Sequence, residues 1–244
     1  MLKKLMALLL ALVMIGTLAA CKDPEQPTPD TPSDPSNDLE DPAPLRVKSG
    51  EIPNSELSWE LYTDGVLYIK GTGEMGEFEA NSGISTRQPW HDYIGNTEDY
   101  TIKKVFVEAG VTSLSEGAFQ NCINLESVEI NSEITVIPAK CFNRCVMLRT
   151  LRAKGVREIG DGAFQHCERL TTLTVSATLD TVWDGAFSEC ATNSTGFAVR
   201  LAGNATEWDT AKARMDESQE DDLAIWTGND VLLTALEKVT FVSK

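Results

Sequence analysis

Histidine, basic residues and long apolar runs are scarce in this 244-residue sequence. Its two histidines are too few for a histidine-rich metal centre. Lysine and arginine number 21 against 37 aspartate and glutamate residues, so the formal net charge is −16 at pH 7. This acidity argues against nucleic acid or anionic lipid as a partner recruited by long-range attraction. After the first twenty residues, no apolar run approaches the length of a membrane-spanning helix.

Residues 1–20 have the pattern of a targeting segment rather than of a folded element. Two lysines precede the apolar run LMALLLALVMIG, which leads into LAAC at residues 18–21. This arrangement resembles the lipobox of bacterial lipoproteins. The resemblance implies cleavage before Cys21, a diacylglyceryl thioether on its sulfur and a fatty acyl group on its new amine. The alternative is an ordinary secretory signal that a cysteine follows by chance.

Proline is concentrated in the segment that follows, residues 21–44. Residues 22–44 contain seven of the ten prolines and seven acidic residues, with almost no large apolar side chain. Such a composition cannot bury enough surface to fold, so we predict an extended tether. At about 3.1 Å per residue in polyproline II geometry, the tether reaches roughly 70 Å. The rest of the chain is long enough for one elongated domain or two small ones.

The remaining sequence repeats with a period of 22 or 23 residues. The segments GAFQNC, KCFNRC, GAFQHC and GAFSEC each place a cysteine three residues after a phenylalanine. The phenylalanines are Phe119, Phe142, Phe164 and Phe187, and the cysteines are Cys122, Cys145, Cys167 and Cys190. Strand-like runs of the form L-x-x-V-x-I follow the first three cysteines. This periodicity predicts an α/β leucine-rich repeat solenoid, with one strand and a short helical or irregular return in each turn.

Further strands fit the same register at both ends of the repeats. One is expected within residues 102–107, another within GFAVRLA at 196–202, and a last one in LEKVTF at 236–241. We therefore assign 45–101 to a β-rich amino-terminal cap and 102–201 to the repeats. Residues 202–244 are assigned to an elaborated carboxy-terminal cap, with a helix around 207–217 and a final repeat strand. A cap is needed there because an open solenoid end exposes its core.

A known family matches these motifs. The unit IKKVFVEAGVTSLSEGAFQNCINLESVEI, residues 102–130, resembles the BspA-like leucine-rich repeat proteins. Upstream, LSWELYTDGVLYIKGTGEM resembles the β-rich segment that often precedes such repeats. The resemblance covers about residues 56–190 and the last strand, and it leaves roughly 202–235 unmatched. It implies a protein that acts outside the cell, in adhesion or in binding host or neighbouring proteins, with no established catalytic residues.

The repeated cysteines admit three interpretations. Stacked in a solenoid, they form a buried column of small, weakly polar free thiols. An oxidising compartment permits one disulfide instead; with Cys21 acylated, five cysteines remain, so at least one stays unpaired or pairs between molecules. Zinc is disfavoured, because its ligands usually lie close in sequence and only Cys141 and Cys145 do so. We predict structural cysteines, no metal site and no cofactor.

Side chains between the core positions of successive strands are expected to form rows on one open face of the sheet. The candidate ligand-binding row contains Phe106, Glu129, Arg152, Thr174, Arg200 and Thr240. Solenoids hold partners on such extended faces. Phe106 is either an exposed aromatic anchor or a residue that the preceding cap covers. Trp183 stands where other repeats have Ser, Pro or Gly, and it is expected to pack beneath the unmatched segment 202–235.

Together these features predict a lipid-anchored, surface-exposed and non-catalytic binding module of the outer membrane. The expected partner is a protein of a host, a neighbouring cell or the extracellular matrix, with no nucleic acid, and with membrane contact through the lipid alone. A first alternative is a structural subunit of an envelope assembly. A second is a hydrolase that uses His91 and Asp92 of PWHDY together with an activated serine or cysteine.

Overall fold

The computed structural model describes residues 43–78, 88–91, 101–131, 133–218 and 229–244. The predicted leader, the candidate lipidation residue Cys21 and the tether up to residue 42 lie outside the described residues. Within the described part of the chain, no helix has the length and apolar character needed to cross a membrane.

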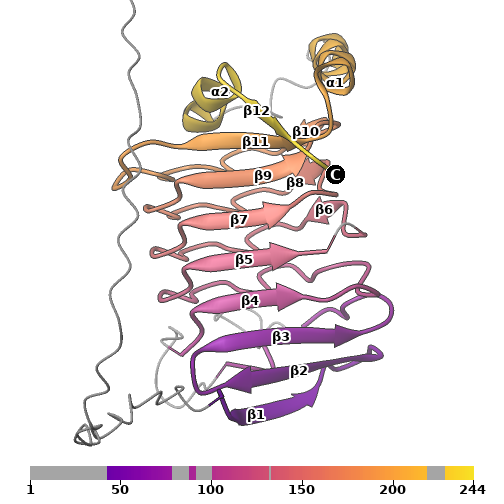
Figure 1. Ribbon diagram of the computed structural model, residues 1–244, viewed down its shortest axis with the longest axis vertical. Helices are drawn as coiled ribbons and strands as arrows, with labels where there is room; N and C mark the ends of the chain where they lie inside the picture. Colours follow the sequence, from indigo (N-terminus) through magenta and orange to yellow (C-terminus); the bar gives the residue numbers. More distant parts are fainter. Residues whose placement is uncertain (1–42, 79–87, 92–100, 132, 219–228) are drawn as a thin grey trace, which may run out of the picture. The chain divides into compact units, whose positions relative to one another are not determined.

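Nine strands form one continuous sheet along the domain, as Figure 1 shows. In spatial order they are β1 (Arg46–Glu51), β2 (Leu57–Tyr62), β3 (Val66–Gly71), β4 (Lys104–Val107), β5 (Ser127–Ile130), β7 (Thr150–Ala153), β9 (Thr172–Ser176), β11 (Ala198–Ala202) and β12 (Thr240–Val242). The first three strands are antiparallel to one another. From β3 onward every neighbouring pair is parallel, as successive turns of a solenoid require.

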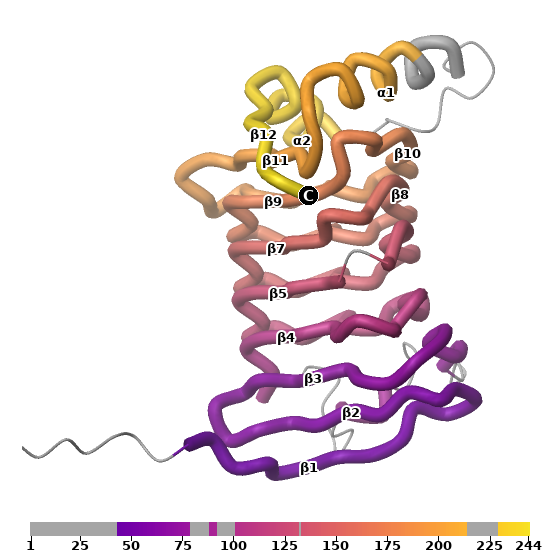
Figure 2. The backbone as a smooth tube through the Cα atoms, turned by 45° about the vertical axis from the view of Figure 1, so that its right-hand side comes forward, coloured from indigo at the N-terminus to yellow at the C-terminus, as the bar shows by residue number. Residues whose placement is uncertain are grey.

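A second, smaller sheet lies on the return path of the turns. Its strands are β6 (Val136–Ile137), β8 (Glu158–Ile159) and β10 (Thr181–Val182), paired in parallel in the order β10-β8-β6. Figure 2 shows how the chain coils from the large sheet to the small one and back. The returns between these strands consist of turns, with no helix in the described residues of the repeats. The predicted repeat solenoid is thus confirmed, with irregular rather than helical returns.

The repeated phenylalanines form a stacked column inside the coil. Ring centroids are 5.4 Å apart between Phe119 and Phe142, and 5.5 Å between Phe142 and Phe164. The next step, from Phe164 to Phe187, is 5.0 Å. Trp90 extends the column at one end by stacking on Phe119 at 5.4 Å. All of these side chains are buried, so one aromatic column joins the cap to the last repeat.

The GAF segment forms a turn that needs a left-handed residue. Gly117, Gly162 and Gly185 have φ values of 60°, 56° and 59°, and Lys140 occupies the same place with φ of 55°. Glycine adopts this conformation without the steric cost that a Cβ atom adds. The repeated glycine is therefore a requirement of the backbone, and Lys140 is the strained exception.

Two helices and β12 follow the last repeat. The helix predicted around 207–217 is confirmed as α1 (Ala205–Ser218). It starts with a reciprocal cap, in which the Glu207 amide donates to Asn204 Oδ1 and the Asn204 amide donates to Glu207 Oε2. Before α2 (Asp230–Leu236), the fully buried Asn229 accepts a 2.8 Å hydrogen bond from the Phe187 amide and donates to the Trp183 carbonyl. This amide holds the carboxy-terminal segment against the final turn.

Candidate functional site

The predicted row lies in register across six strands. Direct partners along it are Phe106 and Glu129, Glu129 and Arg152, Arg152 and Thr174, Thr174 and Arg200, and Arg200 and Thr240. Side chains alternate between the two faces of a strand, so the residues on either side of each row member point into the core. The placement of the row is confirmed; its binding role stays a prediction.

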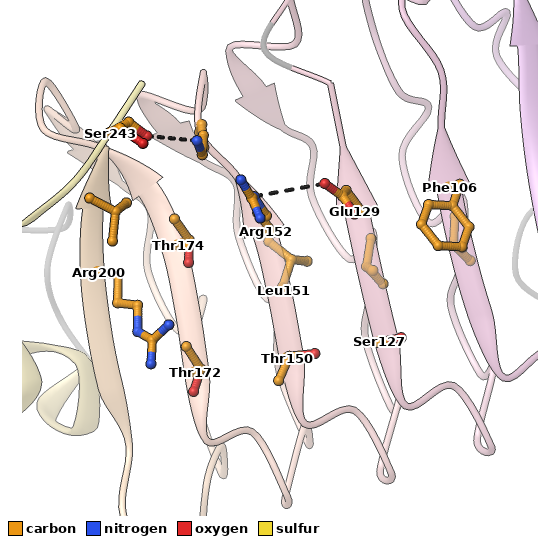
Figure 3. Close-up of a pocket in the computed structure, with 14 residues that line it drawn as sticks. Phe106, Ser127, Glu129, Thr150, Leu151, Arg152, Thr172, Thr174, Arg200 and Ser243 are labelled. Atoms are coloured by element: carbon orange, nitrogen blue, oxygen red, sulfur yellow. Dashed lines mark hydrogen bonds and ion pairs between the residues drawn. The ribbon is translucent and has the colours of Figure 1, made fainter. Parts of the chain in front are cut away.

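A groove of about 470 Å³ follows this row on the open face of the large sheet. We call it the strand-face groove, and Figure 3 shows its lining. Five of the six predicted residues line it: Phe106, Glu129, Arg152, Thr174 and Arg200. Three hydroxyl residues of a neighbouring row, Ser127, Thr150 and Thr172, line it as well. At the far end it is bounded by Lys154, Val242 and Ser243.

Charged groups in the strand-face groove are partly paired. Arg152 Nε lies 3.7 Å from Glu129 Oε1, with both side chains about half exposed. Such a solvent-exposed pair contributes about 0–1 kcal/mol to stability. Lys154 Nζ donates a 2.6 Å hydrogen bond to the Ser243 carbonyl. Among the described residues, Arg200 makes no ion pair, although its side chain is exposed. The groove therefore keeps one guanidinium available for a ligand.

Two members of the predicted row differ from the expectation. Thr174 is buried, with 7% of its surface exposed, because arginines flank it on both sides in register and Ser243 lies at the same end of the groove. The expectation that Thr174 offers an open contact surface is therefore wrong. Thr240 is exposed on β12 but does not line the groove. Four of the six predicted residues therefore both line the groove and expose their side chains at least in part: Phe106, Glu129, Arg152 and Arg200.

Phe106 continues into an aromatic row on the cap, which sequence reasoning missed. Its ring stacks on Tyr68 of β3, with centroids 5.4 Å apart and planes inclined by 16°. Tyr62 of β2 meets Tyr68 edge-on at 5.5 Å. All three rings are partly exposed, so the cap flanks Phe106 without covering it. The available signal was the alternation in LSWELY, where Ser, Glu and Tyr62 occupy the positions that the structure leaves partly exposed.

A fixed charge cluster lies beside this aromatic row. Glu60 accepts hydrogen bonds from Lys70 Nζ at 2.8 Å, the Tyr62 hydroxyl at 2.9 Å and Arg46 Nη1 at 2.7 Å. The bond from Lys70, followed by those from Tyr62 and Arg46, lowers the pKa of Glu60 to about 2. The same contacts raise the pKa of Tyr62 and of Lys70. One carboxylate thus holds two cations, and Lys70 Nζ also lies 3.8 Å from Glu108 Oε1, so these groups are committed to the structure of the cap.

Trp183 is not packed beneath the carboxy-terminal segment. Its side chain is 45% exposed, and its indole Nε1 donates a 2.8 Å hydrogen bond to Glu158 Oε1 on the neighbouring turn. Among the described residues of that segment, Asn229 contacts Trp183 through the backbone carbonyl. The expectation was wrong because residue type cannot distinguish a buried indole from one held on the surface by a carboxylate.

The repeated cysteines are buried free thiols. Cys145 Sγ donates to the Phe119 carbonyl at 3.1 Å, and Cys167 Sγ donates to the Phe142 carbonyl at 3.2 Å. Burial raises the pKa of both thiols well above the usual value, and it raises the pKa of Cys190 to about 12. Since the thiolate is the nucleophile and metal ligand, these groups are unsuited to either chemistry.

The other candidates for chemistry lie away from the groove. His91 is buried, with 8% exposed, and does not line the strand-face groove. Asp92, its proposed partner in a hydrolase, lies outside the described residues. Within the described ranges, no cluster of three or more His, Cys, Asp or Glu side chains could hold a metal ion.

Parallel strands in register, a period of 22 or 23 residues and stacked core side chains define this domain as a leucine-rich repeat solenoid. Residues 97–201 match the family described as "BspA type Leucine rich repeat region", in six copies. The repeat region of this chain belongs to that BspA-type family. No match was found among curated proteins.

Solved structures similar to this chain are also leucine-rich repeat proteins. One is from Eubacterium ventriosum, with 22% identity over 65% of this chain and 45% of its own, and a TM-score of 0.44. A leucine-rich cell surface protein from Faecalibacterium prausnitzii has 23% identity over 66% of this chain and 41% of its own, with a TM-score of 0.41. A third, from Bacteroides ovatus, has 14% identity over 64% and 46%, with a TM-score of 0.36. The chain spans less than half the length of each.

Proposed function

We propose that this protein is a lipid-anchored binding protein of the bacterial cell surface, which recognises a protein partner through the strand-face groove and without catalysis. The observation that carries the proposal is the groove itself, built on a rigid parallel sheet and lined by exposed polar side chains in register. Because the backbone beneath is fixed by ladder hydrogen bonds, the groove loses little conformational freedom when a partner binds.

The chemistry of the described residues supports recognition rather than a reaction. The five repeat-region cysteines are buried, and burial raises the pKa of Cys141, Cys145, Cys167 and Cys190, which disfavours their nucleophilic thiolate form. In the groove, Glu129 is paired with Arg152, and its carboxylate has no histidine or second acid beside it among the lining residues. A general acid–base mechanism needs such a positioned partner.

Display at the cell surface is supported by the amino-terminal sequence and by the family. The LAAC segment supports acylation of Cys21, and the acidic, proline-rich residues 22–44 support a tether that holds the domain away from the membrane. The protein from Faecalibacterium prausnitzii is described as a cell surface protein. We propose an outer-membrane lipoprotein whose partner is a protein of a host, a neighbouring cell or the matrix.

Capture of candidate extracellular proteins by the full chain in detergent tests the groove. The double variant Arg152→Glu/Arg200→Glu reverses two charges in the groove. The control, Arg149→Glu/Arg169→Glu, makes the same change at exposed positions that do not line it, one just before β7 and one in a turn. A partner retained by the wild type and the control variant, but lost by the groove variant, supports the proposal. Equal capture by all three proteins overturns it. A stoichiometric partner from the producing bacterium would instead indicate an envelope assembly.

Lipid attachment is tested separately. Growth with a radiolabelled fatty acid should label the wild type and leave Cys21→Ser unlabelled, while protease added to intact cells should digest a surface-displayed domain. Label on the Cys21→Ser variant, or protection from protease in intact cells that vanishes on lysis, contradicts the anchor or the surface location respectively.

A further inference from the structure

We infer that the strand-face groove binds a short extended peptide, with a carboxylate at Arg200 and an apolar or proline side chain at Phe106. This inference rests on the proposed function and names the chemistry of the partner. It combines the charge balance of the groove, the aromatic stack at one end and the distance between the two ends.

The charge of the strand-face groove is opposite to that of the chain. Arg152, Lys154 and Arg200 line it together with one acid, Glu129, whereas the whole sequence carries −16. Glu129 is paired with Arg152, and Lys154 is bonded to the Ser243 carbonyl. The Arg200 side chain is left over, and Figure 3 shows its guanidinium lying along the face beside Thr172. A carboxylate is the protein group that matches a guanidinium in charge and in two-pronged geometry.

The acidity of the rest of the chain limits how many charges the ligand can carry. At physiological salt the Debye length is about 8 Å, so the groove charges dominate only for groups that are already close to them. A polyanion extends beyond that distance and meets the acidic surface of the domain. The ligand is therefore a peptide with one or two carboxylates, rather than a nucleic acid or a polyanionic glycan.

The opposite end of the groove is aromatic. Phe106 lines it and stacks on Tyr68 of the adjacent strand β3, so the ring is held in place from the side away from the other groove residues. Rigid aromatic surfaces bind apolar side chains with little entropy loss, and aromatic-lined grooves accept proline in extended peptides. Between the two ends, the hydroxyls of Ser127, Thr150 and Thr172 offer hydrogen bonds to the peptide groups of a ligand.

The distance between the ends sets the length of the peptide. Phe106 on β4 and Arg200 on β11 are separated by four strand steps, through β5, β7 and β9. At about 4.8 Å for each step the span is about 19 Å, and an extended peptide advances about 3.3 Å per residue. About six residues therefore bridge the groove, with the acid near one end and the apolar residue near the other.

Random dodecapeptides displayed on phage and selected on the immobilised full chain in detergent test this inference. We expect enriched sequences in which an Asp or Glu lies four to six residues from a proline, aromatic or aliphatic residue. One enriched peptide is then synthesised with a fluorophore and titrated against the wild type, Arg200→Gln and Lys104→Gln. Lys104 is an exposed base on the same face that does not line the groove, so both variants lose one positive charge.

The expected result is binding at least about tenfold weaker for Arg200→Gln and within about twofold of wild type for Lys104→Gln, since bonds to charged groups contribute at least a tenfold factor. Replacing the acid of the peptide by its amide should weaken binding to the wild type but not further to Arg200→Gln. A melting temperature equal to that of the wild type shows that each variant is folded.

The inference is overturned by any of three results: no enriched peptide, enriched peptides without an acid, or equal weakening by Arg200→Gln and Lys104→Gln. None of these three results contradicts the proposed function if the Arg152→Glu/Arg200→Glu variant still fails to capture the partner that the wild type retains. Conversely, selection of the expected peptides without groove-dependent capture of any folded protein refutes the proposed partner class and leaves the groove chemistry standing.

Discussion

Phe106 of the first repeat strand stacks on Tyr68 of the amino-terminal cap, with ring centroids 5.4 Å apart. The two residues are also direct partners in the β3–β4 ladder, so backbone register and side-chain stacking connect the same pair. The cap is therefore a structural continuation of the repeats, and its aromatic row lengthens the surface that the solenoid presents.

Stacking between these two rings should be measurable as a coupling energy. We expect Tyr68→Ala and Phe106→Ala to be non-additive by about 0.5–1.5 kcal/mol in the free energy of unfolding, the usual range for aromatic pairs. Urea unfolding of the wild type, both single variants and the double variant gives this value. Additive losses within about 0.3 kcal/mol would show that the rings contribute only by burial.

The phenylalanine column predicts a large effect at its centre. Phe164 is fully buried between Phe142 and Phe187, so Phe164→Ala leaves a cavity in the column and should cost about 3–5 kcal/mol. Phe164→Leu keeps most of the volume and should cost clearly less. Denaturant unfolding followed by far-ultraviolet circular dichroism measures both. A loss below about 1 kcal/mol for the alanine variant would mean that the column relaxes around the gap.

Lys140 predicts a stabilising substitution. It holds φ of 55° at a place where three other repeats have glycine, and a left-handed residue with a Cβ costs roughly 1–2 kcal/mol. Lys140→Gly removes this strain but raises the conformational entropy of the unfolded chain, which offsets part of the benefit, so a net gain of about 0.5–1 kcal/mol is expected. Its exposed contact with Glu116, at 3.7 Å, contributes little.

The reverse change at an equivalent position is the matched control. A Cβ added at Gly162 meets no atom closer than 3.6 Å, so Gly162→Ala tests the backbone conformation alone and should lower the melting temperature. A lower melting temperature for Lys140→Gly as well would show that strain at this turn is not what selects glycine.

The buried thiols predict alkaline destabilisation. Because their folded pKa values lie above the ordinary value of 9.0, their contribution to stability is complete below about pH 9 and is lost as pH rises. For Cys190, whose pKa is about 12, the loss falls between those two values. Each such thiol adds a slope of about 1.4 kcal/mol per pH unit in this window.

Comparison with Cys190→Ala isolates this effect from the titration of lysine and tyrosine. The variant should lose stability less steeply between pH 9 and the limit of the measurement, and native wild-type protein should not react with a thiol reagent at pH 8 until it is unfolded. Identical slopes for the two proteins, or rapid labelling of the native state, would contradict burial of the thiols.

Sequence periodicity was sufficient to predict the repeats, because every turn of the solenoid buries equivalent side chains at the same spacing. The spacing of Phe119, Phe142, Phe164 and Phe187 located the column, and the positions between core residues placed the row from Phe106 to Arg200 in the correct register. Side-chain alternation in a strand is a local property, so it can be read without knowing the neighbours.

The exposed fraction of a side chain depends on its neighbours in space, and the sequence was insufficient to predict it for two residues. Thr174 has an outward position, but two flanking arginines and the distant Ser243 segment bury it. Trp183 is the opposite case, in which a single carboxylate, Glu158, holds a large aromatic ring at the surface. The cap lies outside the repeat pattern, so the contact of Tyr68 with Phe106 had no equivalent elsewhere in the chain to indicate it.

The parallel register from β3 to β12 has an evolutionary consequence. Neighbouring turns meet through the same backbone bonds and the same aromatic stacking, so duplication of a block of 22 or 23 residues would add a coil without any redesign of the interior. Each added coil would lengthen the strand face by about 4.8 Å. Gene duplication could thus lengthen or shorten the strand-face groove while both ends of the domain stay unchanged.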